Sequence, residues 1–296
     1  MKSVLPTVAL AASLPFCLAG CVVVDTQGHI AREEKRFTVS GVPELNLTTF
    51  DGAIEIRAGE GKSVIVEVEK RGPTPQAIEQ LKVETQQAGN RIEVSVKRPS
   101  RDVEFFGFNG MSATAKLIVT MPREGHVTAR SGDGSIRIEH VSGRLELRTG
   151  DGSIRATGIG GQIILATGDG SVTVDDAEGD IDVDTGDGSV SVAGKLAIVK
   201  LHTGDGSITF RAEPGTTMKD NWSLTTGDGG VSVYLPSDFA AQLDAHTGDG
   251  AIRNELDIKS DGGGEVSRRT VKGQIGAGGR TLRIRTGDGS VRLKAS

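Results

Sequence analysis

The sequence has few aromatic residues and few cysteines. Aromatic side chains make up 3% of its 296 residues, and its two cysteines are Cys17 and Cys21. Cys17 lies in an N-terminal segment that we expect to be cleaved off, so the mature chain would retain one thiol and form no internal disulfide. We therefore expect the fold to be stabilised by other contacts.

Several signatures of function are also missing. The sequence has no G-x-S-x-G nucleophile motif, no phosphate-binding P-loop and no dinucleotide-binding fingerprint. Its five histidines have no spacing typical of metal ligands. The net charge is −5 and no basic patch dominates, which argues against a nucleic-acid partner. We therefore expect no cofactor and no bound nucleic acid.

Glycine is abundant, with 42 residues, and much of it belongs to one repeated motif. The tetrapeptide T-G-D-G, or a near copy, occurs eight times, and its first five aspartates follow one another at intervals of 18 residues. A fixed period near 20 residues is typical of stacked architectures in which each repeat forms one coil. The eight aspartates are Asp133, Asp151, Asp169, Asp187, Asp205, Asp228, Asp249 and Asp288.

Apolar and polar residues alternate on both sides of each motif. Around Asp187, Ile181 and Val183 precede the turn, and Val190 and Val192 follow it. This period of two predicts two short strands per repeat, each with one inward face. No helix-period segment separates the strands, which excludes a βαβ array. The sequence therefore predicts an all-β fold, a parallel β-solenoid with about 18–23 residues per coil.

Each coil is expected to have two corners. Two residues before each aspartate stands a threonine, or Ser131 in the first copy, which we expect inside the first corner. The motif glycines allow turns where φ is positive or where a Cβ would clash with the next coil. A second glycine corner is expected on the opposite side, at Gly143, Gly161 and Gly179.

The register of the repeat extends toward the N-terminus. Asp51 has apolar residues at the same offsets, so we interpret it as a degenerate first copy. We expect a tether at 21–36, a β-rich N-terminal region and cap at 37–123, and the regular solenoid at 124–296. Within the cap region we expect strands at 63–69, 91–97 and 115–121, and one short helix from Pro75 to about Thr85.

The N-terminus has the pattern of a secretion signal. An apolar run from Val4 to Ala19 follows a basic start and is too short for a comfortable membrane span. It ends in L-A-G-C at 18–21, which resembles a bacterial lipobox, where cleavage precedes a cysteine that carries a diacylglycerol. We therefore predict a lipoprotein signal peptide at 1–20, a lipid on Cys21 and, since no aspartate follows, attachment to the outer membrane. An ordinary signal peptide with a chance cysteine is the alternative.

The row of aspartates has three interpretations. In the one that we favour, each carboxylate accepts hydrogen bonds from backbone N–H groups of its own turn, and the row is structural. In the second, the carboxylates bind cations as in calcium β-rolls, although each coil has one aspartate and calcium needs six to eight oxygens. In the third, they catalyse polysaccharide cleavage, although such sites use a local, unrepeated carboxylate cluster.

The T-G-D-G-S-[IV] repeat, with the L-x-L strand before it, resembles the DUF4097 family of β-strand repeat proteins, described as candidate adhesins. It is also similar to head-GIN-domain candidate autotransporter adhesins. The resemblance covers about residues 36–296, from F-T-V at 37–39 to L-R-I-R-T-G-D-G-S-V at 282–291. It implies a right-handed β-helix-like fold at the cell envelope, and no catalytic residue can be carried over from the family.

We therefore expect a non-catalytic, lipid-anchored envelope protein whose rigid solenoid presents a surface for binding, adhesin-like or as an envelope scaffold. The expected partners are the membrane, through the lipid, and a glycan or another envelope protein. Alternatives are an enzyme acting on envelope or extracellular polysaccharide, or a calcium-binding protein similar to a β-roll. Contacts are expected from outward charged residues, namely Arg148, Asp182, Asp184, Lys200, Arg283 and Arg285.

Overall fold

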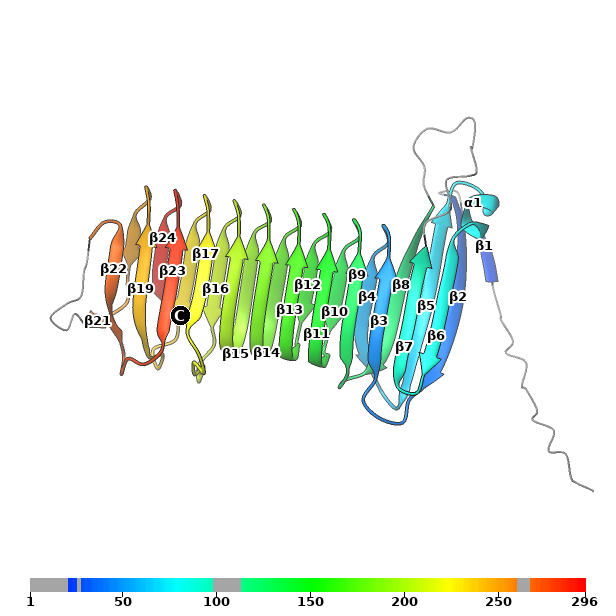
Figure 1. Cartoon of the computed structure of the whole chain (residues 1–296), viewed down its shortest axis with the longest axis horizontal. Helices are drawn as coiled ribbons and strands as arrows, with labels where there is room; N and C mark the ends of the chain where they lie inside the picture. The colour runs from blue at the N-terminus through cyan, green and yellow to red at the C-terminus, as the bar shows by residue number, and fades with distance from the viewer. Residues whose placement is uncertain (1–20, 26–27, 98–112, 260–266) are drawn as a thin grey trace, which may run out of the picture.

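The computed structural model describes residues 21–25, 28–97, 113–259 and 267–296 (Figure 1). Within these ranges the chain forms 24 β-strands in one continuous sheet and one short helix, which confirms the expected all-β class. The predicted signal peptide at 1–20 lies outside the described residues. Among the described residues, no helix has the length and apolar character needed to cross a membrane.

Each coil has one strand that leads into a GDG turn and one that leaves it. The leading strands form one wall, the pre-turn face, and the leaving strands form the other, the post-turn face. The pre-turn face comprises β3 (Glu44–Thr49), β9 (His126–Ser131), β11 (Ser142–Thr149), β13 (Gly160–Thr167), the ends of β14 (Val172–Thr185) and β15 (Val190–Thr203), β17 (Trp222–Thr226), β19 (Ala241–Thr247) and β23 (Thr281–Thr286). The post-turn face comprises β4 (Ile54–Gly59), β10 (Ile136–Glu139), β12 (Ile154–Thr157), the beginnings of β14 and β15, β16 (Ile208–Ala212), β18 (Val231–Leu235), β20 (Ile252–Asn254) and β24 (Val291–Ala295).

Equivalent strands of adjacent coils pair in parallel and in register. Ile163 of β13, for example, pairs with Leu145 of β11 on one side and with Ile181 of β14 on the other. These inward residues are at most 2% exposed and belong to one core that runs through the stack. The alternation in the sequence therefore correctly predicted two strands per repeat, and successive coils pair in parallel from that of Asp133 to that of Asp228.

The second glycine corner is also confirmed. Gly143, Gly161 and Gly179 have φ values of 139°, 100° and 113°, a region that favours glycine. A Cβ at any of them would lie 2.2–2.3 Å from a carbonyl oxygen of the preceding coil. Because the coils approach so closely here, any other residue would force them apart.

Antiparallel strands close the N-terminal end of the stack. β8 pairs in parallel with β4 but antiparallel with β5, and β5 continues antiparallel to β2 and then β1, while β6 pairs antiparallel with β7. The strands expected at 63–69, 91–97 and 115–121 are therefore present. The strands of this cap are β1 (Cys21–Asp25), β2 (Gly28–Thr38), β5 (Ser63–Gly72), β6 (Lys82–Ala88), β7 (Arg91–Lys97) and β8 (Thr114–Pro122).

The tether expected at 21–36 is instead part of this cap. β1 and β2 form a hairpin, and β2 pairs with β5 from His29 to Thr38. The segment is polar because its charged side chains pair across the sheet, as Arg32 does with Glu69 at 2.7 Å. A polar composition alone was therefore a poor guide to the structure of this segment.

The expected helix is shorter than predicted. Helix α1 spans Pro75–Glu79, and the Thr74 hydroxyl caps it by accepting a hydrogen bond from the Ala77 N–H at 3.2 Å. From Lys82 onward the chain pairs with β7 as strand β6 and cannot continue the helix.

The order of the coils in space differs from their order in the sequence at both ends. The coil of Asp288 lies between the coils of Asp228 and Asp249, because β23 pairs with both β17 and β19, and β24 with both β18 and β20. Figure 1 shows red β23 between yellow β17 and orange β19. At the other end, the coil of Asp51 lies between β7 and β8 on one side and β9 and β10 on the other. Asp51 therefore belongs to a true repeat, but the first and last copies are inner coils.

Two further strands cover the C-terminal end. β22 (Thr270–Ile275) pairs antiparallel with β19, and β21 (Ile258–Lys259) pairs antiparallel with β22. These two strands thus lie outside β19, before the chain returns to insert its last coil.

Replacing Leu282 tests the coil order. Leu282 is fully buried and lies in register between Trp222 and Leu243. We expect Leu282→Ala to lower the free energy of unfolding by about 2–5 kcal/mol, because the cavity opens between two packed neighbours. As a comparison, Leu256→Ala, at a partly buried position beside the core, should lower the free energy of unfolding by about 1 kcal/mol. Equal losses in urea unfolding would contradict the inner position of the last coil.

Candidate functional site

A hydroxyl group holds each GDG turn against the adjacent coil. In the coil of Asp205, the Thr203 hydroxyl donates to the carbonyl oxygen of Gly188 at 2.9 Å and accepts from the Gly206 N–H at 3.2 Å. Thr203 is completely buried, so these bonds are shielded from water. The equivalent hydroxyls that donate to a neighbouring coil belong to Ser131, Thr149, Thr167, Thr185, Thr226, Thr247 and Thr286.

The glycines of the turn let the backbones of adjacent coils approach each other. A Cβ on Gly206 would lie 2.1 Å from the carbonyl oxygen of Gly188, and one on Gly204 would lie 2.7 Å from that of Gly186. The Gly204 N–H donates to the same Gly186 oxygen at 2.6 Å. The two glycines therefore serve close stacking, as the sequence predicted.

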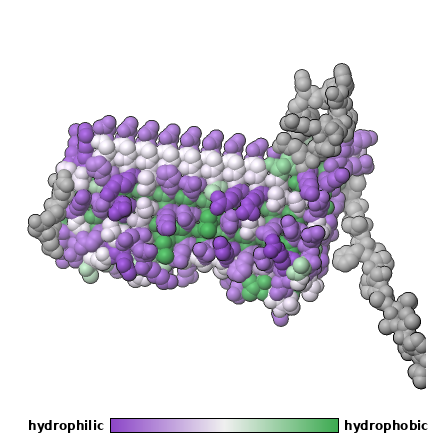
Figure 2. Space-filling model, in the orientation of Figure 1, coloured by the Kyte–Doolittle hydropathy of each residue, from purple (hydrophilic) through white to green (hydrophobic). Residues whose placement is uncertain are grey.

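The aspartates of the turns do not make the hydrogen bonds that we expected. All eight are exposed, and within the described part of the chain none accepts a bond from its own turn, although Asp249 lies 3.6 Å from Arg269. The Thr203 hydroxyl and its equivalents take that role because their side chains point into the corner. Figure 2 shows the resulting row of hydrophilic residues along one long edge of the stack.

The aspartate row is a linear acidic edge. Neighbouring carboxylates one coil apart, at roughly 4.8 Å, repel each other by about 0.9 kcal/mol in water. Among the described residues, no group of three or more His, Cys, Asp or Glu side chains could hold a metal ion.

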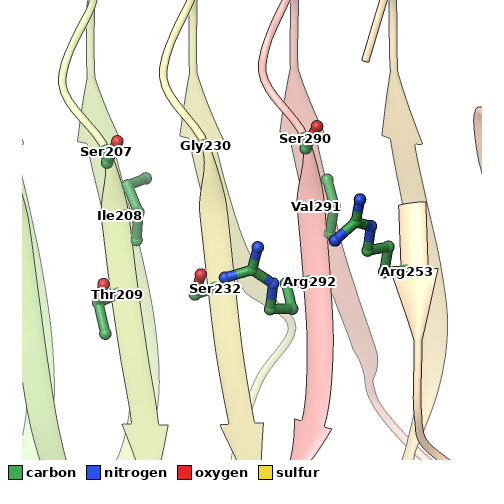
Figure 3. Close-up of a pocket in the computed structure, with 9 residues that line it drawn as sticks. All are labelled: Ser207, Ile208, Thr209, Gly230, Ser232, Arg253, Ser290, Val291 and Arg292. Carbon is green, nitrogen blue, oxygen red and sulfur yellow. The ribbon is translucent and has the colours of Figure 1, made fainter. Parts of the chain in front are cut away.

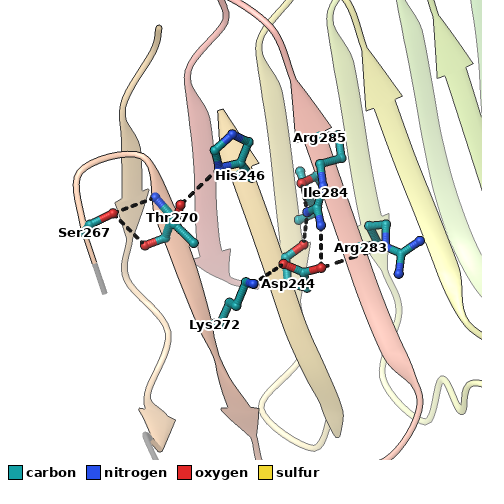
Figure 4. Close-up of polar contacts among 8 residues, drawn as sticks. All are labelled: Asp244, His246, Ser267, Thr270, Lys272, Arg283, Ile284 and Arg285. Atoms are coloured by element: carbon teal, nitrogen blue, oxygen red, sulfur yellow. Dashed lines mark hydrogen bonds and ion pairs between the residues drawn. The ribbon is translucent and has the colours of Figure 1, made fainter. Parts of the chain in front are cut away.

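An ion cluster on the pre-turn face joins the inserted last coil to its neighbours (Figure 4). The Asp244 carboxylate accepts a hydrogen bond from Arg285 and lies 3.9 Å from both Lys272 and Arg283. Burial opposes ionisation of Asp244, but the Arg285 hydrogen bond and the surrounding positive charges outweigh it and lower the pKa of Asp244. The cluster therefore connects β19, β22 and β23.

The residues expected to contact a partner divide into two groups. Arg283 and Arg285 belong to the Asp244 cluster, and Arg148 donates to Glu146 at 3.0 Å. The hydrogen bond from Arg148, together with nearby arginine charges, lowers the pKa of Glu146 against the effect of burial. In contrast, Asp182, Asp184 and Lys200 are exposed and have no ion pair within the described residues.

A hollow of about 250 Å³ lies on the post-turn face where four coils meet. Ser207, Gly230 and Ser290 line it, and they occupy the same turn position in adjacent coils. Gly230 has no side chain where the turns on either side have serine, and a Cβ there would meet only the Ser290 carbonyl oxygen, at 3.3 Å, so this end of the hollow is open. Arg253 and Arg292 form its other side.

The two arginines are the unusual feature of this hollow. They pair in register on β20 and β24, and Arg292 pairs in turn with Ser232 of β18. Figure 3 shows both guanidinium groups extending in the same direction, that of Arg292 toward Ser232 and that of Arg253 toward Val291. Within the described residues neither guanidinium has an ion-pair partner, whereas Glu255 on the same face binds Lys294 at 3.3 Å.

Two like charges in adjacent strands are unfavourable without a counter-ion. Side by side at one rung of separation, they repel by about 0.9 kcal/mol in water and by more where solvent is displaced. The flanking side chains are hydroxyls, which can donate to or accept from a ligand. The arrangement can therefore bind an anionic group.

Comparison with known proteins assigns the chain to a family. The family model for DUF4097, Toastrack, matches residues 42–294. The chain belongs to the DUF4097 (Toastrack) family. No curated protein has significant similarity to it.

Several solved structures are similar to this Toastrack chain. A candidate lipid-binding protein from Parabacteroides distasonis is 13% identical, with a TM-score of 0.47, over 88% of this chain and 96% of its own. A candidate adhesin from Bacteroides fragilis is 11% identical, with a TM-score of 0.43, over the same shares of 88% and 96%. A candidate cell adhesion protein from Clostridium sporogenes is 16% identical, with a TM-score of 0.28, over 90% of this chain and 100% of its own.

Sequence reasoning did not identify Arg253 and Arg292 as site residues. Each stands four positions after the aspartate of its motif, an outward position that the alternation predicts. The two arginines become neighbours because the last Toastrack coil is inserted beside that of Asp249. The repeat pattern does not predict this order of coils. The sequence does show that Gly230 replaces the serine found at this position in most other repeats. It does not show that this position borders a hollow, because that depends on which coils flank it.

Substitutions in a single turn separate the roles of threonine and aspartate. Thr203→Val keeps the shape but leaves the Gly188 carbonyl and the Gly206 N–H without their buried partner, so we expect a loss of about 1–3 kcal/mol in the free energy of unfolding. Thr203→Ser should be less destabilising, because Ser131 makes the same bonds in its own turn. The free energy of unfolding of Asp205→Ala should differ from that of the parent by no more than about 0.5 kcal/mol. If urea unfolding shows that Asp205→Ala loses as much free energy of unfolding as Thr203→Val, the aspartate must also form a stabilising bond in the turn.

The lowered pKa of Asp244 predicts a pH dependence. Because the folded pKa lies below that of the unfolded chain, the contribution to stability is present above the ordinary aspartate value, about 3.9, and is lost as the pH falls through the folded pKa. Asp244→Asn should therefore lower the melting temperature at pH 7, and the difference from the parent should shrink below about pH 4. The control is Asp182→Asn, at an exposed position. A constant difference across this pH range would rule out the ion cluster as the cause.

Proposed function

We propose that the chain is a non-catalytic, lipid-anchored protein of the cell envelope that presents a rigid β-solenoid surface for binding. The observation that carries this proposal is the in-register stacking of coils, which lines up outward side chains in straight rows on two solvent-exposed faces. Such regular rows suit a partner that is itself extended, either a glycan chain or another envelope protein.

The position of Cys21 supports the lipid anchor. Strand β1 begins at this residue and pairs with β2, which belongs to the cap at the N-terminal end of the stack. A diacylglycerol on Cys21 would therefore hold the stack by one end, close to the bilayer, without a long flexible tether. The signal peptide at 1–20 remains part of the proposal on the strength of the L-A-G-C motif, and the outer-membrane location because Val22, not an aspartate, follows Cys21.

The distribution of acidic residues supports a binding role over an enzymatic one. The turn carboxylates are equivalent from coil to coil, and the acids with lowered pKa values, Glu69, Glu146 and Asp244, are each held by arginines as structural ion pairs. Catalytic carboxylates of polysaccharide-cleaving enzymes are unrepeated, and the proton donor among them has a raised pKa.

Substitution of either cysteine tests the anchor. We expect Cys21→Ser to abolish labelling by a fatty-acid analogue and to release the protein from the membrane fraction, because the acylated thiol is lost. Cys17→Ser, inside the predicted leader, is the matched control and should leave labelling and fractionation unchanged. Membrane attachment of Cys21→Ser equal to that of the control would overturn the lipid anchor.

The binding role is tested on the same anchored protein. After crosslinking in its own envelope, recovery of the full-length protein should also recover a glycan or a protein above the level seen with an unrelated lipoprotein. Recovery of no partner would contradict the binding function while leaving the anchor intact.

A further inference from the structure

A straight row of outward side chains runs along the post-turn face, four positions after each turn aspartate. Strand register places Thr173, Ser191, Thr209 and Ser232 one after another in this row. Arg155 precedes Thr173, and Arg292 follows Ser232. The row therefore has hydroxyl groups on four successive coils and a guanidinium at each end.

A second row lies beside it, nearer to the turns. Ser189, Ser207 and Ser290 are exposed in this row, and Gly230 interrupts it at the hollow. The post-turn face thus presents two parallel lines of hydroxyls, with its shallow depression at the end where Arg253 and Arg292 lie. A hydroxyl can both donate and accept a hydrogen bond, which matches the hydroxyls of a sugar.

The two rows of hydroxyls and the hollow together form one strip on the post-turn face. Its arginines give this strip selectivity for acidic groups. The planar guanidinium presents a fork of N–H donors that matches the two oxygens of a carboxylate or sulfate. Arg253 and Arg292 are exposed, adjacent and without an ion-pair partner in the described chain, so a ligand anion would relieve their mutual repulsion. Lys294 on the same face is already bound to Glu255.

We propose that this strip binds an acidic polysaccharide that lies along the stack. The acid groups of the polysaccharide contact Arg292 and Arg253 at the hollow, and its sugar hydroxyls bond to Ser232, Thr209 and the coils beyond. An extended chain fits better than a single headgroup, because the hydroxyl rows continue over several coils away from the hollow. The inference rests on the proposed binding function and names its ligand class.

The test measures binding of the mature full-length protein to three soluble probes by isothermal titration calorimetry. The probes are polygalacturonate, which carries carboxylates, dextran sulfate, which carries sulfates, and neutral dextran. We expect binding to at least one acidic probe and at least tenfold weaker binding to neutral dextran. Comparison of the two acidic probes tells which anion the site prefers.

Variants with equal changes of net charge locate the site. The double variant Arg253→Ala/Arg292→Ala should bind the preferred acidic probe at least tenfold more weakly. Arg130→Ala/Arg144→Ala, which removes two exposed charges from the pre-turn face, should change binding less than twofold. Arg253→Lys/Arg292→Lys keeps the charge but loses the fork, so its affinity should fall between that of the parent and that of the alanine pair.

Three results would overturn the proposal. One is an equal loss in the two alanine pairs, which would mean unspecific attraction between charges. Another is binding of neutral dextran as tight as that of the acidic probes. The third is no binding of either acidic probe by a protein that still recovers a partner from its own envelope, since the binding function would then hold with a different ligand class.

Discussion

The structure depends on the close approach of one backbone to the next at the GDG turns. Gly204 and Gly206 lie so near the preceding coil that a single Cβ would collide with its carbonyl oxygens. The Thr203 hydroxyl then bonds both to the neighbouring coil and to its own turn. Because one contact closes the turn and joins the coils, the stack has a fixed register, and the aliphatic side chains of each coil fall directly on those of the next.

A stack of this kind has two ends at which strands lack a partner, and exposed strand edges invite aggregation. This chain covers both ends with antiparallel strands, β5 and β6 at one end and β22 at the other. It also places its first and last repeats inside the stack instead of at its limits. The terminal repeats are therefore held on both sides, which protects the positions where a linear array would otherwise fray.

The residues that dominate the sequence are not those of the proposed binding strip. The turn aspartates dominate the sequence, yet they point to solvent, and hydroxyls do the bonding that we expected of them. The proposed binding strip arises where the repeat changes, at Gly230 and at the arginines of the last two coils. The regular stacking of coils produces straight rows of outward side chains. Departures from the repeat produce the hollow, at Gly230, and the positive charge of the two arginines, which is unpaired within the described residues.

The sequence by itself determined the all-β class, the two strands per repeat, the inward residues and the glycine corners, because alternation and period are local properties that the backbone obeys directly. It predicted three strands of the cap, at 63–69, 91–97 and 115–121, but it did not determine β2, which is stabilised by pairing with the distant β5 and not by its own composition. Nor did it determine which coils are neighbours. All repeats share one pattern, so the last coil fits at several positions, and only the tertiary structure, with Leu282 packed between Trp222 and Leu243, decided that it lies inside the stack and brings Arg292 beside Arg253.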